Sequence, residues 1–421
     1  MTSVAIIGTG IAGMACGHFL HERYDVTFYE KNNYIGGHTN TVTVNENEAS
    51  VNIDTGFIVY NEVTYPNLVR LFSELNVETA LSSMTFSVCH QPTGLEYCGS
   101  GFNGLFAQRS NLLNQNFIQL LRQINRFNTE CLELLNDEKN YSLTLVDFVK
   151  NKGFSEDFLE KYLVPMSSAI WSTEPDAMLK FPAVALVRFF KNHGLLGMNS
   201  HHTWRTVKNG SASYRSKLIA PFRDKIHTGR AAAAVTRTNG KAVVTDSNGE
   251  RTSYDKVIFA CHADQALLLL NDPELLEIKL LEPFRYQKNR AVLHSDSSVM
   301  PRTKRAWSSW NYRLEYDHQQ SVSPSTTYYM NSLQPLAGKR DYFVSINDNG
   351  RIDESTIHYQ AEYEHPIFSV EAMSRQNELP LLNEKGVSYF CGSYFKYGFH
   401  EDALTSALEL CRKLTGRRIW Q

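Results

Sequence analysis

The first thirty residues alternate between apolar runs, a glycine-rich turn and a segment with helical periodicity. Val4–Ile7 is short and wholly apolar, as expected of a buried parallel strand. Gly8–Gly13 follows at once, and Met14–Arg23 then places apolar or small residues at helical spacing. A second strand-like run, Asp25–Tyr29, ends on Glu30. The pattern predicts two parallel strands joined by a helix, with a tight turn after the first strand.

The turn has the spacing Gly-x-Gly-x-x-Gly, which is typical of a dinucleotide site. Gly8 permits the tight turn, Gly10 lets the backbone approach a pyrophosphate, and Gly13 lets the helix pack closely on its strand. The N-terminus of the helix offers free N–H groups to the phosphates. Glu30 stands where an acid accepts hydrogen bonds from ribose hydroxyls. Such a motif alone also occurs as a structural turn, but the strand, helix, strand and acid in register favour the nucleotide site.

The same glycine spacing recurs at Gly99–Gly104 without that context. The preceding stretch, Val88–Cys98, is broken by Pro92 and Gly94, and no strand ending in an acid follows. We expect a loop here, and no second nucleotide site for NADPH.

Later segments predict a hairpin, a helical insertion and further strands. Thr41–Val44 and Ala49–Ile53 flank a polar turn and read as a hairpin. Residues 62–200 are mostly helical in pattern; the expected helices are Tyr65–Leu75, Leu112–Leu135, Leu143–Lys152, Ser155–Tyr162 and Ala183–Asn192. Strand patterns return afterwards, at Ala231–Thr236, Ala242–Asp246, Lys256–Ala260, Ala306–Leu314, Thr326–Asn331 and Val387–Cys391. A final helix is expected from about Glu401 to Leu414.

These elements predict an α/β fold with two domains. Val257–Ala260 is apolar enough to rejoin the first sheet, so the nucleotide-binding domain is discontinuous. We assign it residues 1–61, 206–284 and 381–421. A substrate or lid domain with helices and a mixed sheet takes residues 62–205 and 285–380.

Composition and charge limit the kinds of binding partner that we expect. The 421 residues carry a formal net charge of −2 with no dense basic run, which argues against nucleic acid as a partner. The seven cysteines form no Cys-x-x-Cys pair or ligand cluster, so we expect a reducing compartment and no metal. No leader and no membrane-spanning run is apparent, which predicts a cytoplasmic protein. Ala183–Asn199 mixes Val187, Phe189, Phe190, Leu195, Leu196 and Met198 with Arg188 and Lys191. This segment is either an ordinary packed helix or a peripheral membrane contact at the inner face of the membrane. The oligomeric state stays open.

Three separated blocks resemble the flavin-containing amine oxidase superfamily, which includes protoporphyrinogen oxidase and phytoene-desaturase-like enzymes. They are Gly8–Gly13 with Glu30 and Gly36–Thr39, then Asp54–Gly56 with Tyr65–Thr79, and finally Phe390–Gly392 with Gly398–Ala403. More narrowly, the chain is similar to a bacterial subgroup described as predicted NAD/FAD-binding proteins.

The resemblance implies one FAD, bound without a covalent bond. Its contacts would come from the first strand–turn–helix unit, from the two later blocks and from one backbone position in the expected strand Ala231–Thr236. These residues are Gly8, Gly10, Ile11, Ala12, Gly13, Glu30, Lys31, Gly37, His38, Thr55, Gly56, Phe57, Ala232, Gly392, Phe399, His400 and Ala403. The N–H of His400, at the start of the last helix, would point at the flavin, where a helix N-terminus stabilises negative charge. The chain departs from the family at His38, commonly Arg, at Phe57, often Gly or Ala, and at Ser393-Tyr394, where an acid is usual.

The expected activity is that of an FAD-dependent oxidoreductase that removes hydride from a C–N or an allylic C–H bond. No catalytic residue is evident: Lys288, Lys304 and Lys396 are each possible counterparts of a flavin-proximal lysine of amine oxidases. Trp307, Trp310 and Tyr312 alternate as on a strand and either line a substrate pocket or pack in the core. The absence of an obvious acidic pair for a polyamine favours a lipidic or polyisoprenoid substrate over a small amine. A redox-neutral isomerase and a flavin-bound accessory protein for a lipid-modifying partner remain alternatives, and the electron acceptor stays open.

Overall fold

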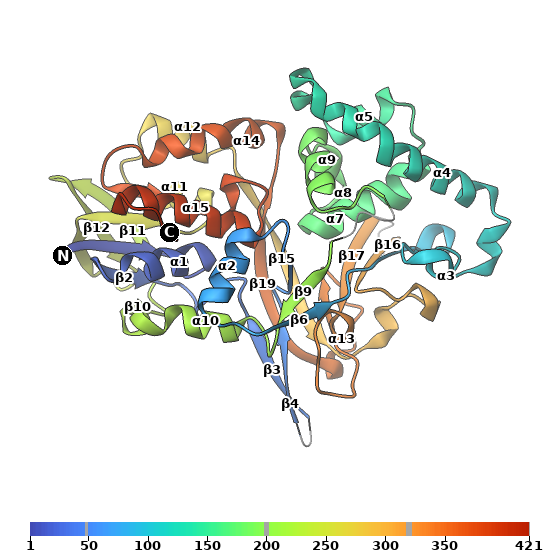
Figure 1. Ribbon diagram of the computed structural model, residues 1–421, viewed down its shortest axis with the longest axis horizontal. Helices are drawn as coiled ribbons and strands as arrows, with labels where there is room; N and C mark the ends of the chain where they lie inside the picture. The colour runs from blue at the N-terminus through green and yellow to red at the C-terminus, as the bar shows by residue number, and fades with distance from the viewer. Residues whose placement is uncertain (47–48, 198–201, 317–321, 421) are drawn as a thin grey trace.

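A computed structural model describes residues 1–46, 49–197, 202–316 and 322–420 of the chain (Figure 1). One part of the molecule surrounds a parallel sheet and holds both labelled termini, whereas helices α3 to α9 form the opposite part. The long strands β15 (Arg285–His294) and β19 (Ile357–Ile367) lie between the two parts.

The parallel sheet is built from both ends and the middle of the chain. Its order is β10-β2-β1-β14-β20, and all of its pairings are parallel. The strands are β1 (Thr2–Ile7), β2 (Tyr24–Tyr29), β10 (Ile226–His227), β14 (Lys256–Phe259) and β20 (Ser388–Phe390). Val4, Ala5 and Ile6 of β1 are fully buried, as the apolar run predicts. The expected return of the segment around Val257 to this sheet is confirmed, since Ala5 pairs with Val257.

Two helices from opposite ends of the chain pack together beside this sheet. They are α1 (Ile11–Leu20) and α15 (His400–Thr415). Helix α1 begins three residues earlier than the periodicity predicts, because Gly10 occupies the N-cap and the rest of the glycine motif is helical. Cys16 of α1 lies with its Sγ 3.8 Å from that of Cys391, inside the core between α1 and β20.

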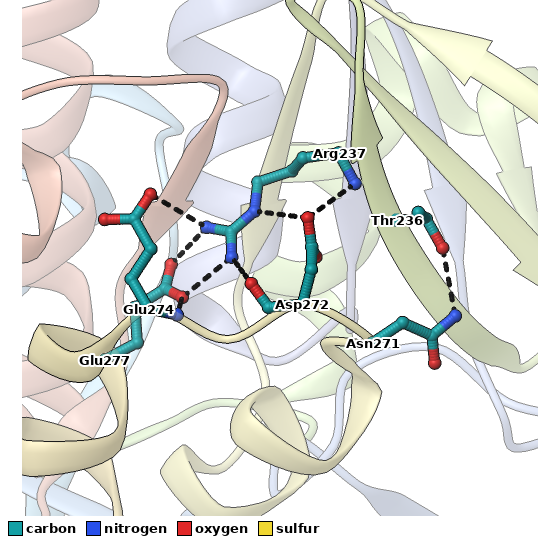
Figure 2. A network of polar contacts seen from close by, with 6 residues as sticks. All are labelled: Thr236, Arg237, Asn271, Asp272, Glu274 and Glu277. Carbon is teal, nitrogen blue, oxygen red and sulfur yellow. Dashed lines mark hydrogen bonds and ion pairs between the residues drawn. The ribbon is translucent and has the colours of Figure 1, made fainter.

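A small antiparallel sheet packs near the parallel sheet, and one of its arginines links it to a neighbouring helix. Its strands are β11 (Ala232–Thr238), β12 (Lys241–Asp246) and β13 (Arg251–Tyr254). Arg237 donates to both carboxylate oxygens of Glu277 at 2.6 and 3.0 Å and to the Asp272 carboxylate at 3.3 Å, with Glu274 at 3.8 Å (Figure 2). Glu277 lies in α12 (Leu275–Leu281), which follows α11 (Ala263–Leu269). The network therefore ties β11 to α12.

The second large sheet is mixed and has seven strands in the order β19-β15-β18-β17-β16-β7-β8. Besides β15 and β19 it contains β7 (Phe86–His90), β8 (Leu95–Cys98), β16 (Trp310–Tyr316), β17 (Val322–Tyr329) and β18 (Phe343–Ile346). Only β16 and β7 pair in parallel among its described pairings. The smaller pieces are the predicted hairpin β3 (Thr41–Glu46) and β4 (Ala49–Asp54), and a sheet of β5 (Val59–Asn61), β9 (Trp204–Val207) and β6 (Thr79–Ser82).

Residues 62–197 are mostly helical, as predicted. The helices are α2 (Pro66–Glu74), α3 (Gly101–Leu105), α4 (Gln115–Glu130), α5 (Leu145–Asn151), α6 (Glu156–Phe158), a π-helical turn (Leu159–Leu163), α7 (Val164–Trp171), α8 (Pro175–Leu179) and α9 (Ala183–Asn192). The single helix expected over Leu112–Leu135 is wrong: 3₁₀ turns flank α4 on both sides. Asn114 causes the first break, since its side chain caps α4 by accepting from the N–H groups of Asn116 and Phe117.

Two further expectations for this region need correction. Gly99–Gly104 is not a plain loop, because α3 begins at Gly101 after β8. Val187, Phe189 and Phe190 of α9 are buried, so they do not form the exposed apolar face of a membrane contact. Met198 lies outside the described residues. No helix in the described part of the chain is long and apolar enough to cross a bilayer.

The predicted α/β fold, with a Rossmann-like sheet and a second region of helices and mixed sheet, is confirmed. The domain boundaries stay a prediction. Helices α10 (Ala212–Ile219), α13 (Met330–Leu333) and α14 (Val370–Arg375) complete the main elements.

Candidate cofactor and substrate site

One cavity of about 1740 Å³ connects the glycine turn to the helical region. All but two of the residues expected to contact the cofactor line it: Gly8, Gly10, Ile11, Ala12, Glu30, Lys31, Gly37, His38, Gly56, Phe57, Ala232, Gly392, Phe399, His400 and Ala403. The exceptions, Gly13 and Thr55, lie just behind the lining. The structure thus gathers residues from both ends of the chain around a single space.

The three motif glycines have three different surroundings. Gly8 has φ +102°, and a Cβ there would lie 2.7 Å from the carbonyl oxygen of Ala260. A Cβ on Gly13 would lie 2.1 Å from the carbonyl oxygen of Gly8, so the close packing expected at this position is present. A Cβ on Gly10 would meet no protein atom within 4 Å. Gly10 therefore presents its backbone to open space in the cavity.

Glu30 joins the end of β2 to this turn. One carboxylate oxygen accepts from the N–H of Thr9 at 3.1 Å and from its hydroxyl at 2.6 Å. The other accepts from the N–H of Asn32 at 2.8 Å. A carboxylate has about four acceptor sites, so ribose hydroxyls can still be accommodated. Glu30 also orders the glycine turn, a role that the motif alone does not indicate.

His38 lies beside the glycine turn in a cluster of aromatic rings. A Cβ on the preceding Gly37 would be 3.4 Å from Cα of Gly10. The His38 ring stacks on Tyr363 at 4.9 Å and meets His365 edge-on at 5.1 Å. Burial, assisted by the neighbouring histidines, holds the pKa of His38 well below its usual value, so the ring is neutral at pH 7.

The N-terminus of α15 faces the cavity through Gly398, Phe399 and His400. Asp402 holds the turn by accepting from the N–H groups of Tyr397 and Phe399 at 3.1 and 3.0 Å. The His400 ring stacks on Phe57 at 3.9 Å, and its Nε2 lies 2.6 Å from the hydroxyl of Tyr214. Burial lowers the pKa of His400 to about 3. The ring is a neutral support for Phe57, which leaves the backbone N–H at the helix start to face a ligand.

The block that begins at Asp54 supports the lining from behind. Asp54 accepts from Thr41, from Ser211 and from Gln334, and burial raises its pKa to about 6. The Thr55 hydroxyl lies 2.7 Å from that of Tyr363. Gly56 is required by close approach, since a Cβ there would lie 2.3 Å from the carbonyl oxygen of His38.

The other half of the cavity is apolar. Its lining from residues 62–197 and 202–205 and from the seven-stranded sheet at 310–361 is dominated by aromatic and aliphatic side chains: Tyr65, Met84, Phe86, Tyr97, Leu105, Leu121, Ile124, Tyr162, Met166, Ile170, Trp171, Phe189, Leu195, Trp204, Trp310, Tyr328 and Tyr359. In these described segments no Asp, Glu, Lys or Arg lines the cavity; the charged lining residues of β15 and β19 are Lys288, Glu362 and Glu364, and Lys288 is paired with Glu362. His193 is the buried polar ring here, with a pKa that burial lowers to about 4.

The aromatic residues that meet the start of α15 form a continuous layer. Phe189 stacks on Phe399 at 4.8 Å and on His193 at 3.8 Å. Trp171 donates its Nε1–H to the carbonyl oxygen of Tyr397 at 3.1 Å. Helices α7 and α9 are thereby fixed over the turn at the start of α15.

The three candidate lysines and the alternating aromatic residues lie in different environments in the structure. Among the three lysines only Lys288 lines the cavity, and its Nζ lies 2.9 Å from Glu362. Lys304 lies over the Trp307 ring, and Lys396 is exposed. Trp310 lines the cavity, whereas Tyr312 packs in the core against Ala169.

Sequence reasoning missed four cavity-lining histidines, His193, His202, His262 and His365. His262 follows β14 and stacks on Tyr286 at 4.2 Å, with Nδ1 3.4 Å from Glu364. The position of His262, three residues beyond the buried parallel strand β14, was the available signal, because ligands bind at the carboxyl ends of such strands. His365 lies on β19, and nothing local to it indicates the cavity.

The residues present fit a flavin dinucleotide. Five buried polar atoms of cavity-lining side chains have no hydrogen-bond partner: His38 Nε2, His262 Nδ1, Asn128 Oδ1, Trp310 Nε1 and Tyr394 Oη. Orphaned polar atoms at a cavity are satisfied by a ligand or by water. Together with the open space at Gly10 and the two helix N-termini, they define a dinucleotide-binding site joined to an apolar pocket.

Comparison with known proteins identifies the family to which the chain belongs. The family model of the flavin containing amine oxidoreductases matches residues 11–299, and the chain belongs to this family. It is an FAD-dependent oxidoreductase, and the FAD is bound without a covalent bond. The buried position of Cys391, against Cys16 and off the cavity lining, agrees with that.

Individual relatives are distant. The 15-cis-phytoene desaturase of Synechococcus elongatus is 34% identical over 92 residues, which are 21% of this chain and only about a fifth (19%) of the desaturase. The cyclohexylamine oxidase of Brevibacterium oxydans has a similar structure, with a TM-score of 0.67, 15% identity, and coverage of 98% of this chain and 99% of the oxidase. A CLA-producing fatty acid isomerase from P. acnes matches with a TM-score of 0.64 at 13% identity over 99% of both chains. The structural likenesses show the shared fold.

Proposed function

We propose that the protein removes hydride from an allylic C–H bond of a long, apolar, unsaturated substrate such as a fatty acyl or polyisoprenoid chain. The observation that carries the proposal is the substrate half of the cavity, which is lined by aromatic and aliphatic side chains and by no charged residue of the described helical segment. A cationic amine buried there would have no carboxylate partner, and an unpaired buried charge is costly.

The chemistry requires little acid–base apparatus from the chain. Bound FAD accepts the electrons, so the protein has to bind, orient and shield the substrate. The layer of Trp171, Phe189 and Phe399 does the shielding next to the start of α15. The relatives that act on unsaturated chains by their names, the phytoene desaturase and the fatty acid isomerase, support the same substrate class.

The test is anaerobic incubation of the yellow protein with a panel of unsaturated fatty acids and isoprenoids and a panel of primary and secondary amines. Bleaching of the flavin absorption by a lipid supports the proposal. Conversion of a lipid to an isomer of the same mass, without net bleaching, would replace oxidation by isomerisation. Bleaching by a simple amine alone refutes the lipidic substrate. If nothing bleaches the flavin and a second protein co-purifies tightly, the accessory role replaces the enzymatic one.

A matched pair of variants tests the pocket itself. Ile124→Glu places a carboxylate on the cavity-lining face of α4, whereas Gln119→Glu places one on an exposed part of the same helix. Ile124→Glu should lower kcat/KM for the lipid roughly tenfold or more, because a buried charge is unfavourable beside an apolar chain. FAD content should not change in either variant. Equal kcat/KM for both variants would refute the assigned pocket.

A further inference from the structure

We propose that His38, His262 and His365 receive the pyrophosphate of FAD and take up a proton from solvent when the cofactor binds. The inference rests on the FAD of this family and is independent of the substrate. It assigns to the cofactor two histidines, His262 and His365, that no motif indicates.

The location follows from the glycine turn. The second glycine of the motif is where the backbone approaches a pyrophosphate, and that glycine is Gly10. Gly37 abuts Gly10, which places His38 next to the phosphate position. The Ala260 N–H donates to the carbonyl oxygen of Ile7 at 2.9 Å, so His262 follows at the same sheet edge as the turn. His365 completes the group through its edge-on contact with His38.

His38 and His365 each have a ring nitrogen that is not engaged by a protein carboxylate. His38 Nε2 is buried and has no hydrogen-bond partner, whereas His262 Nδ1 lies 3.4 Å from the Glu364 carboxylate without a hydrogen bond to it. His365 Nδ1 lies 2.8 Å from Nδ2 of Asn289, whose Oδ1 accepts from Asn347 at 2.8 Å. Asn289 therefore donates to His365, which leaves the hydrogen of that ring on Nε2. Phosphate oxygens accept hydrogen bonds of this kind.

Permanent positive charge is scarce around the cluster. Within the described residues no arginine lines the cavity, and the lining lysines are Lys31 and Lys288, the latter paired with Glu362. The other titratable groups that line this end, from the glycine turn, β14–α11, β15, β19 and α15, are Glu30, Tyr34, Cys261, Tyr286, Tyr359, Tyr363, Glu364 and His400, with Asp264 close behind. Burial raises the pKa of Cys261 and of Tyr363 to about 12, so neither gains charge near neutral pH. The histidine cluster itself can supply positive charge by taking up a proton when an anion binds.

Burial makes the His38 and His365 rings neutral before an anion binds. It lowers the pKa of His365 to about 4 and holds that of His38 well below its usual value. An anion within hydrogen-bond distance favours the charged form and raises the pKa of the ring beside it. The pKa is thus higher in the complex than in the free protein. By linkage the affinity is greatest below the pKa of the free protein, falls by up to about tenfold per pH unit for each proton taken up as pH rises between the free and the bound pKa, and levels off above the pKa of the complex.

The experiment is an FAD titration of the full-length protein after removal of its flavin, followed by flavin fluorescence between pH 6 and pH 8.5. Calorimetry at pH 7 in two buffers of different ionisation enthalpy counts the protons. We expect the Kd to rise about three- to tenfold per pH unit over part of this range, with net proton uptake. A flat Kd together with a buffer-independent enthalpy would overturn the proposal.

Variants locate the proton. His38→Gln should bind FAD more weakly and with a shallower pH slope, and His38→Arg should bind with a flat pH profile because its charge is permanent. His358→Gln, on the same strand as His365 but off the cavity lining, serves as the control and should behave like the unchanged protein. Where His38 variants do not fold, His262→Gln gives the same comparison from a half-buried position. An unchanged slope in the folded cluster variants refutes the assignment.

Discussion

Substituting Gly10 and Gly13 by alanine should separate cofactor binding from folding, because the two glycines differ in what a methyl group would meet. Gly10 has φ −61° and ψ 177°, which alanine adopts freely, and its Cβ would touch no protein atom within 4 Å. Gly13 lies inside α1, and its Cβ would lie 2.1 Å from the carbonyl oxygen of Gly8. The backbone of the turn or of the helix must therefore move in Gly13→Ala.

The magnitudes follow from these contacts. In Gly10→Ala the gain of about 0.4–1 kcal/mol from a stiffer unfolded chain opposes the loss of a few tenths to about 1 kcal/mol at the N-cap, so the unfolding free energy changes little. The added methyl group occupies the space over the turn and prevents at least one charge-assisted hydrogen bond to phosphate, worth about 1.5–3 kcal/mol. The Kd for FAD should then rise about 10- to 150-fold. Gly13→Ala should cost about 1–3 kcal/mol of unfolding free energy through overpacking.

Urea denaturation of the flavin-free proteins measures the first quantity, and fluorescence titration with FAD measures the second. Retention of the original Kd in Gly10→Ala would refute the placement of the pyrophosphate at this turn. A loss of stability in Gly10→Ala equal to that of Gly13→Ala would refute the account of the open space.

Three further predictions concern the supporting contacts. Glu30→Ala leaves the N–H groups of Thr9 and Asn32 without their acceptor, and the flavin-free protein should lose about 1–3 kcal/mol in urea denaturation, with Glu30→Gln losing less. Arg237→Ala strands the buried Glu277 carboxylate and should cost about 3–5 kcal/mol without affecting FAD titration, and Arg237→Lys should recover only part because lysine lacks the planar fork; a full recovery would show that the charge alone matters. His294 Nδ1 accepts from the N–H of Asp296 and burial lowers the pKa of this ring to about 4, so its stabilising contribution is complete above pH 6.5 and is lost as pH falls towards 4. The loss should reach about 3 kcal/mol in thermal or urea unfolding, and His294→Gln should show a shallower decline over the same interval.

The parts of the fold that follow from local pattern were predictable, and those that depend on distant pairing were not. Val4–Ile7, the glycine turn and the acid at residue 30 are one continuous unit, so periodicity and spacing are enough to place them. The break before α4 had a local signal, because Asn114 is a favourable N-cap residue. A prediction from apolar periodicity alone does not take this signal into account.

The cavity wall depends on pairings that no local pattern contains. His365 reaches His38 only because β19 pairs with β15 and thereby passes the glycine turn. The apolar pocket is likewise lined by residues of α4, α9 and β16. The periodicity of each segment predicts that one face is buried, but it does not predict which cavity that face lines. The roles of the residues around the cofactor stay predictions, since the family match establishes the FAD but not the individual contacts.

The assembly of the parallel sheet from the two ends of the chain determines when during biosynthesis the protein can hold its cofactor. Gly392, which follows β20, and Phe399 and His400 at the start of α15 lie about 380 residues after the glycine turn, so at common elongation rates they are made roughly 20 to 80 seconds after it. Until then helix α1 lacks α15 beside it, and strand β14 lacks its neighbour β20. Because the expected cofactor contacts come from segments this far apart, we expect FAD to stabilise the folded protein by mass action and not the growing chain.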